Sequence, residues 1–182
     1  TRTFSAKTGE HSYENVRIVA QNLEKIISMS FCHMQFIDSY RFLSASLETL
    51  VENLAAACDG EYLKFEHTRR HFVSVDKTLF AKGVYPYEYM DSFDKFDETK
   101  LPSKDCFCSH LNECEISDEE YERAVYIWDT FECKTLQDYH NHYLKTDVLL
   151  LGDVFESFRT TCMYYYGLDP AQYLTLPSFS LD

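Results

Sequence analysis

Hydrophobic residues recur with a helical period between Thr135 and Gly167, the longest regular pattern in the chain. They fall three or four residues apart, with one interval of seven, so that one side of a helix is apolar and expected to be buried. The residues on this side are Tyr139, Tyr143, Leu150, Val154, Phe158, Cys162 and Tyr165. Asp147 lies one turn after Tyr143 on the same side, where another aliphatic residue would fit best. A charged side chain on a side that is expected to be buried calls for a structural or functional explanation.

Three short runs near the start of the chain have β character and precede a second helix. Residues 15–21, 25–31 and 33–38 predict a hairpin followed by a third strand. Ser44 or Ser46 is expected to cap a helix that closes near residues 59–60. Its apolar positions at helical spacing are Leu47, Leu50, Val51 and Leu54.

Capping signals predict the later helices. Ser117 opens a capping box that begins a helix ending near Phe131. Thr135 caps the long helix, and Gly167 provides its left-handed stop. The order of β-rich and then α-rich segments predicts a mixed α/β, or α+β, fold.

The segments between these elements give weaker patterns. Short helices are expected at residues 67–72 and 76–81, and residues 97–105 are expected to be a linker. Residues 82–96 hold five aromatic side chains around Gly83 and Pro86, which leave little room for helix. Aromatic residues in such a segment are expected to bury themselves against another element.

Composition and charge narrow the classes of protein. The chain has 182 residues, 45% of them hydrophobic, with 5 Gly and 4 Pro, so we expect one domain, or a piece of one, with a true core. A net charge of −13 disfavours a free-standing nucleic-acid binder, and the same carboxylates suit divalent cations. Seven scattered Cys and the lack of a signal peptide predict an intracellular protein with reduced thiols. No apolar run approaches the roughly 20 residues that span a bilayer, so we expect no membrane association.

Three residues are candidates for chemistry, and the residues alone leave each one open. Tyr143 and Asp147 could share a site in which the carboxylate binds a divalent cation and the hydroxyl orients a water. Alternatively, Tyr143 could be a core aromatic and Asp147 a satisfied or solvated polar residue, since buried aromatics at this spacing are common. Lys82, before Gly83, could meet a phosphate or be an ordinary surface lysine.

Two groups of His and Cys have only a superficial likeness to zinc sites. They are His67 with His71, and Cys106, Cys108 and His110 with Cys114. Neither has the two paired pockets of ligands that a structural zinc site needs. The histidines, which flank two arginines, are better interpreted as part of a small cationic patch. No serine-hydrolase elbow and no glycine-rich phosphate loop is present.

Three long segments together resemble a known family. Residues 36–54 (FIDSYRFLSASLETLVENL), 82–93 (KGVYPYEYMDSF) and 143–159 (YLKTDVLLLGDVFESFR) are similar to the exonuclease region of protein-primed family B DNA polymerases. The most similar group is that of Maverick/Polinton-type transposons and their viral and organellar-plasmid relatives. The resemblance runs from about Ile18 to Leu181.

The resemblance implies a fold, a reaction and roles for residues. The expected fold is a partial ribonuclease-H-like 3′–5′ exonuclease domain with a short N-terminal β-meander and a long C-terminal helix. Tyr143 and Asp147 match the third exonuclease motif, in which the Asp binds a catalytic Mg²⁺ or Mn²⁺ and the Tyr positions the attacking water. Lys82 matches a lysine that contacts the phosphate, and Tyr85, an aromatic residue shortly after it, is expected to bind DNA as well. The implied partners are a single-stranded primer terminus and a terminal protein as primer.

The departures from the family imply an incomplete site. Its first two exonuclease motifs are expected before Ile18, and residues 1–17 contain neither; the polymerase palm would follow Asp182. We therefore expect a fragment of a DNA polymerase that is inactive alone and monomeric, from a nuclear transposon or from a viral or organellar element. Residues 1–12 would be a frayed arm, 13–167 the partial exonuclease domain, and 168–182 the start of the connection to the polymerase. The alternative is a degenerate, non-catalytic structural or interaction domain from a mobile element.

Overall fold

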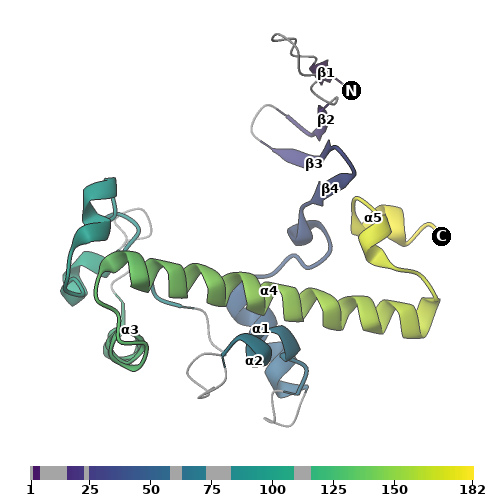
Figure 1. Cartoon of the computed structure of the whole chain (residues 1–182). Coiled ribbons are helices and arrows are strands. Elements are labelled where there is room, and N and C mark those ends of the chain that lie inside the picture. Colours follow the sequence, from purple (N-terminus) through teal and green to yellow (C-terminus); the bar gives the residue numbers. More distant parts are fainter. Residues whose placement is uncertain (1, 5–15, 23–24, 58–62, 73–82, 109–115) are drawn as a thin grey trace. The chain divides into compact units, whose positions relative to one another are not determined.

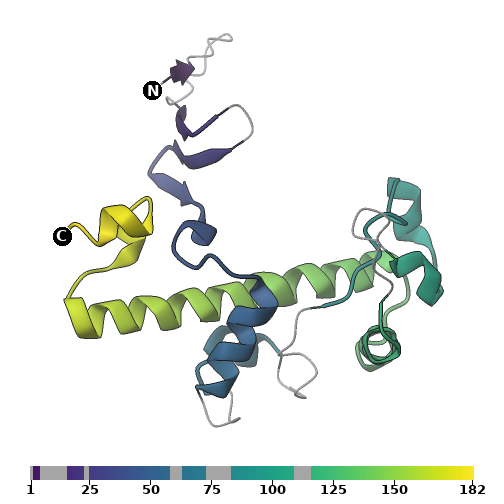
Figure 2. The ribbon, with the colours of Figure 1, turned by 180° about the vertical axis from the view of Figure 1, so that it is seen from behind.

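The computed structural model describes residues 2–4, 16–22, 25–57, 63–72, 83–108 and 116–182. The chain divides into two compact units, Thr1–Ala45 with Phe155–Asp182, and Ser46–Val154. Helix α4 (Leu136–Tyr166) is continuous through the boundary, as Figures 1 and 2 show, and contributes to both units. No helix in the described ranges is long and apolar enough to cross a membrane.

The first unit contains an antiparallel sheet that confirms the mixed α and β class. Its strands are β1 (Arg2–Phe4), β2 (Val16–Ala20), β3 (Ile26–Phe31) and β4 (Met34–Ile37), in the order β1-β2-β3-β4. The three predicted strands are thus present. Residues 1–12 were expected to be a frayed arm, but within them Arg2–Phe4 pair with β2. Strand β2 has backbone N–H and C=O groups on that edge that β3 does not bind, and β1 satisfies them.

One face of this sheet is apolar. Ile18 lies opposite Met29 and Met29 opposite Phe36, while Phe31 lies opposite Met34. Residues opposite each other in a ladder share a face, so these five side chains lie on one side. Met34 and Phe36 are 56% and 50% exposed. The sheet therefore presents uncovered apolar surface.

The rest of the first unit is a small core around the C-terminal part of α4. Phe42, Cys162 and Phe179 are buried together, and Phe155, Phe158 and other apolar residues surround them. Gly167 has a φ of +67°, as its role in stopping the helix requires. The unit also contains η1 (Ser39–Arg41), η5 (Pro170–Gln172) and α5 (Leu176–Phe179).

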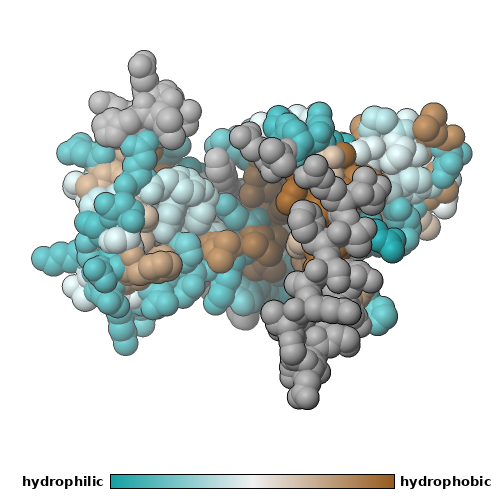
Figure 3. Space-filling model, turned by 90° about the horizontal axis from the view of Figure 1, so that it is seen from above, coloured by the Kyte–Doolittle hydropathy of each residue, from teal (hydrophilic) through white to brown (hydrophobic). Residues whose placement is uncertain are grey.

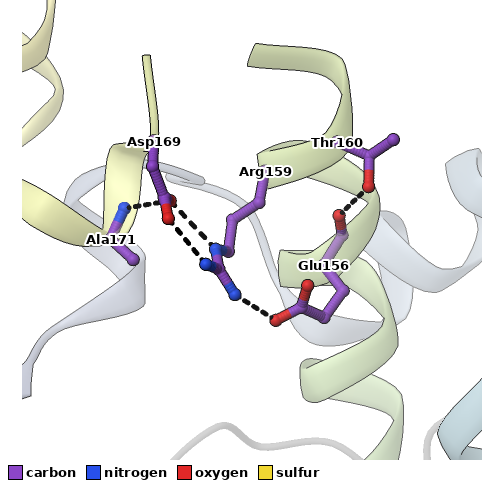
Figure 4. Close-up of polar contacts among 5 residues, drawn as sticks. All are labelled: Glu156, Arg159, Thr160, Asp169 and Ala171. Atoms are coloured by element: carbon purple, nitrogen blue, oxygen red, sulfur yellow. Dashed lines mark hydrogen bonds and ion pairs between the residues drawn. The ribbon is translucent and has the colours of Figure 1, made fainter. Parts of the chain in front are cut away.

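A bidentate ion pair joins the segment after Gly167 to α4 (Figure 4). The Nε and Nη2 atoms of Arg159 donate to the two carboxylate oxygens of Asp169 at 2.9 and 2.6 Å, and Nη1 donates to Glu156 at 2.6 Å. The returning segment packs on the side of α4 that carries Phe158 and Cys162. The expectation that Tyr165 is buried is wrong: it lies in the last turn of α4 and is 70% exposed.

The second unit is helical and includes the part of α4 up to Val154. Its other elements are α1 (Leu47–Ala56), α2 (Glu66–His71), η3 (Phe93–Asp97), η4 (Lys104–Phe107) and α3 (Asp118–Thr130). Ser46 caps α1, and Ser117 with Glu120 forms the predicted capping box of α3. Helix α1 ends at Ala56 with Ala57 as its C-cap, before the expected end near 59–60. The helix expected at 76–81 falls on residues outside the described ranges.

Exposed apolar side chains also occur along α4. Leu144, Val148 and Leu151, three or four residues apart, are exposed on one side of the helix. Figure 3 shows hydrophobic residues open to the surface among hydrophilic ones on the face that it draws.

The buried carboxylate of α4 is Asp153, which the periodicity did not single out. It is 1% exposed and accepts hydrogen bonds from the backbone N–H groups of His67 (2.8 Å) and Thr68 (3.0 Å) and from the Thr68 hydroxyl (2.7 Å). The residue before α2, Phe65, makes no side-chain cap. Asp153 therefore caps α2 from another helix, with its negative charge at the positive end of the helix dipole.

His142 joins α4 to the residue that follows α2, Phe72. Its ring stacks on Phe131 at 4.1 Å between centroids and on Phe72 at 6.3 Å. Burial lowers its pKa, Lys145 and His71 lower it further, and Asp138 opposes them. The imidazole is therefore held in its neutral form against Phe131 and Phe72, whose rings also contact each other.

Replacing Asp153 by Ala should lower the free energy of unfolding by about 2–4 kcal/mol, because three buried donors lose their acceptor. Urea unfolding measures this loss. The control is Asp129→Ala, which removes an exposed carboxylate from α3 and should change stability by less than about 0.5 kcal/mol. Equal effects of the two substitutions would contradict the capping role.

Acid should weaken the fold through His142. The unfolded imidazole has a pKa near about 6.5 and the folded one a lower value, so below about pH 6.5 the unfolded state binds more protons. The stabilisation is complete above this pH and lost as the pH falls. Urea unfolding at about pH 7.5 and 5.5 should show a smaller loss for His142→Phe, which keeps the aromatic stack, than for the original chain. Identical losses would exclude His142 as the cause.

Candidate functional site

Tyr143 and Asp147 lie one turn apart on α4, as the helical period predicts. Both are half-buried. The Tyr143 hydroxyl is hydrogen-bonded to the Tyr87 hydroxyl and interacts with the Asp147 carboxylate. Burial raises the pKa of Tyr143 strongly, and the hydrogen bonds with Tyr87 and Asp147 raise it further. The phenol thus keeps its proton at neutral pH and serves as a hydrogen-bond donor, not as a base.

Gly83 allows the chain to approach Tyr143 closely. A Cβ atom on Gly83 would lie 2.6 Å from Cδ2 and 3.0 Å from Cε2 of the Tyr143 ring. Such distances are well inside van der Waals contact, so only glycine fits without moving the ring. The backbone after Lys82 is therefore fixed against this side chain.

Two further tyrosines of the same segment surround the Tyr143 ring. Tyr85 stacks on it with centroids 4.8 Å apart and planes 28° apart, and Tyr87 meets it edge-on at 6.1 Å and 88°. Both arrangements are favourable for aromatic pairs. Burial raises the pKa of Tyr85, and neighbouring Tyr87 adds to this effect.

The preceding turn of α4 holds the segment in place. The Tyr139 hydroxyl donates to the carbonyl oxygen of Val84 at 2.6 Å, and Tyr139 is only 2% exposed. The Tyr85 hydroxyl and Nδ1 of His140 are 2.8 Å apart. Tyr139, His140 and Tyr143 thus each bind residues 83–87, and the Tyr143 hydroxyl is positioned by packing on a rigid helix.

A pocket of about 160 Å³ lies on residues 83–87 as well. Its lining comes from this segment, α1 and α3: Glu48, Gly83, Val84, Tyr85, Tyr87, Glu120 and Arg123. The Nε atom of Arg123 is buried and has no hydrogen-bond partner among the described residues. At about 30 Å³ per water, the volume suits a few waters or one small ring.

The structure brings most of the predicted site residues together. Tyr143, Asp147 and Tyr85 lie in one cluster, whereas Lys82 falls outside the described residues and only its neighbour Gly83 is placed. The roles assigned to these residues stay predictions. The sequence patterns missed His140 and the position of Tyr87; the only signals were the aromatic content of residues 82–96 and the position of His140 three residues before Tyr143.

The described residues do not by themselves fit a Mg²⁺ or Mn²⁺ ion. Within these ranges, no three His, Cys, Asp or Glu side chains gather in a way that could hold a metal. Such ions are held by several oxygens at once, and Asp147 supplies those of one carboxylate. Of the zinc candidates, His110 and Cys114 lie outside the described ranges.

Comparisons with protein-family models, with curated proteins and with solved structures found no match to this chain.

Gly83→Ala should displace the Tyr143 ring and lower the free energy of unfolding by about 1–3 kcal/mol, the usual effect of overpacking. Thermal unfolding and the near-UV circular dichroism of the tyrosines measure both changes. Gly152→Ala in α4 is the matched control, since nothing lies within 4 Å of its added Cβ. It should stabilise the helix by about 0.5–1 kcal/mol. A neutral Gly83→Ala would show that the close approach is not required.

Proposed function

We propose that this chain is part of the 3′–5′ exonuclease region of a protein-primed family B DNA polymerase of the Maverick/Polinton-type group. The observation that carries the proposal is the packing of residues 83–87 on Tyr143. These residues and α4 belong to two of the three segments that resemble the family, and they lie about 55 residues apart in the sequence. Contact between these two segments is what a shared site requires.

The geometry supports a positioning role for Tyr143. Its protonated hydroxyl is held by Tyr87 and Asp147 and has one O–H to donate, so it can orient a water or a phosphate oxygen that takes the place of one of these partners. The aromatic rings around it suit the bases of a single-stranded primer terminus, which stack on such side chains. Asp147 supplies one carboxylate, so the remaining oxygens for a metal would come from other parts of the polymerase.

The fold supports the proposal at a coarser level. The antiparallel meander β1-β2-β3-β4 and the long helix α4 are the two features expected of a partial ribonuclease-H-like domain. The exposed apolar face of the sheet, with Met34 and Phe36, fits a domain whose remaining elements lie elsewhere in a longer protein.

The alternative is a non-catalytic structural or interaction domain. The net charge of −13, which repels DNA, and the single carboxylate at Tyr143 favour it. The neighbouring reading frame separates the two: an upstream Asp-x-Glu motif and downstream paired-Asp motifs favour the polymerase, and stop codons on both sides favour a relic.

The proposal is tested on the full-length protein that contains these residues, by degradation of a 5′-labelled single-stranded oligonucleotide with Mg²⁺ or Mn²⁺. Asp147→Ala should lower the rate by about 100-fold or more, with DNA synthesis retained. Tyr143→Phe should lower it less, because the ring and its packing remain.

Asp129→Ala, on the exposed side of α3, is the control and should leave degradation unchanged. The 182-residue chain alone should not degrade DNA. Full degradation by the Asp147→Ala protein would overturn the role of Asp147, and strong activity of the isolated chain would overturn the claim that its site is incomplete.

A further inference from the structure

Helix α2 lies antiparallel along α4. Its N-terminal residues His67 and Thr68 bind Asp153, and Phe72, just after its C-terminal end, stacks on His142, eleven residues earlier in α4. Figures 1 and 2 both show α2 close to α4 in the second unit. Thr68 is buried and marks the side of α2 that faces the protein. The opposite side of this short helix faces solvent.

The exposed side of α2 is basic, in contrast to the protein as a whole. Residues 64–71 contain three Lys or Arg, two His and one acidic residue, whereas the chain has 17 Lys and Arg against 30 Asp and Glu. Lys64, His67, Arg69 and His71 are exposed. In the described part of the chain, neither Lys64 nor Arg69 has an ion pair; Arg70 pairs with Glu66.

Helix α4 extends this basic surface with Lys145. Lys145 is exposed and lies one turn after His142, whose ring reaches Phe72 next to His71. We define the α2 patch as Lys64, His67, Arg69, Arg70, His71 and Lys145.

The described carboxylates that contact α2 or interact with His142 are already engaged. Asp153 is buried and accepts three hydrogen bonds, and Glu66 forms an ion pair with Arg70. The Asp138 carboxylate accepts hydrogen bonds from the backbone N–H groups of Lys134 and Thr135. Among the described residues, these carboxylates therefore form no ion pair with Lys64 or Arg69.

We propose that the α2 patch binds the phosphate backbone of single-stranded DNA. Its cations are spread along a helix of about 9 Å and onto a second helix, so they match a row of phosphates better than one small anion. The choice of DNA as the polyanion rests on the proposed function. The presence of the basic surface is independent of it. The net charge of −13 opposes approach at long range, so this binding is weak, local and sensitive to salt.

The test is fluorescence anisotropy of the 182-residue chain with a labelled oligothymidine between about 50 and 200 mM salt. With three or four phosphate contacts, a plot of log affinity against log salt should have a slope of about −2 to −3. The triple variant Lys64→Ala, Arg69→Ala, Lys145→Ala should lose about tenfold or more in affinity and make the slope shallower by about 2. All three side chains are exposed, and circular dichroism checks that the helices are retained.

The matched control is the triple variant Lys25→Ala, Lys100→Ala, Lys134→Ala, which changes the net charge by the same amount at exposed positions elsewhere. It should bind almost as tightly as the original chain. Equal losses in the two variants, or the absence of salt-dependent binding to the original chain, would overturn the proposal. Equally tight binding of an oligoglutamate of matched charge would overturn the assignment to nucleic acid.

This outcome is separable from that of the exonuclease test. Asp147→Ala removes the carboxylate proposed for hydrolysis and should leave binding at the α2 patch intact. If the full-length protein is an active nuclease and its patch variant loses DNA binding, the result bears only on where the DNA runs. If the full-length protein binds DNA at the α2 patch but has no nuclease activity, the result contradicts only the proposed function.

Discussion

The candidate site depends on the close contact between Gly83 and the ring of Tyr143. A side chain at Gly83 would separate the two segments by more than an aromatic stack can accommodate. With glycine there, Tyr85 stacks on Tyr143, and the Tyr87 hydroxyl reaches the Tyr143 hydroxyl. The orientation of the phenol thus follows from packing between two backbone segments, and the burial that this packing causes raises its pKa above the ordinary value.

The two carboxylates of α4 serve different ends because their surroundings differ. Asp153 is buried and fully supplied with donors from α2, which is the signature of a structural group. Asp147 is half-buried beside a phenol and an aromatic cluster, where a carboxylate can still meet a ligand. The capping by Asp153 also fixes α2 along α4, with its basic residues turned outward. One helix therefore organises a structural anchor, a candidate reaction site and a charged surface.

The sequence predicted what local chemistry determines. The caps at Ser46, Ser117 and Thr135, the stop at Gly167 and the strands after residue 15 all appear, because their signals lie within a few residues of the element. Contacts between distant residues could not be predicted. Asp153 lies 85 residues from Thr68, and no periodicity distinguishes it from a solvated carboxylate. The aromatic residues of 82–96 were expected to bury themselves, but Tyr87 and Phe93 are 66% and 87% exposed, and it is Tyr85 and Tyr87 that lie against Tyr143. The burial predicted for Tyr165 failed because the core beside α4 stops short of the last helical turn, in which Tyr164, Tyr165 and Tyr166 are all exposed.

The most direct test of this account is an NMR measurement of through-space contacts between the Hα protons of Gly83 and the ring protons of Tyr143. We predict a strong contact, with the Gly83 protons shifted upfield by the aromatic ring and with both effects lost in Tyr143→Leu. Gly83 protons at random-coil shifts without this contact, in a protein whose α4 is formed, would contradict the account.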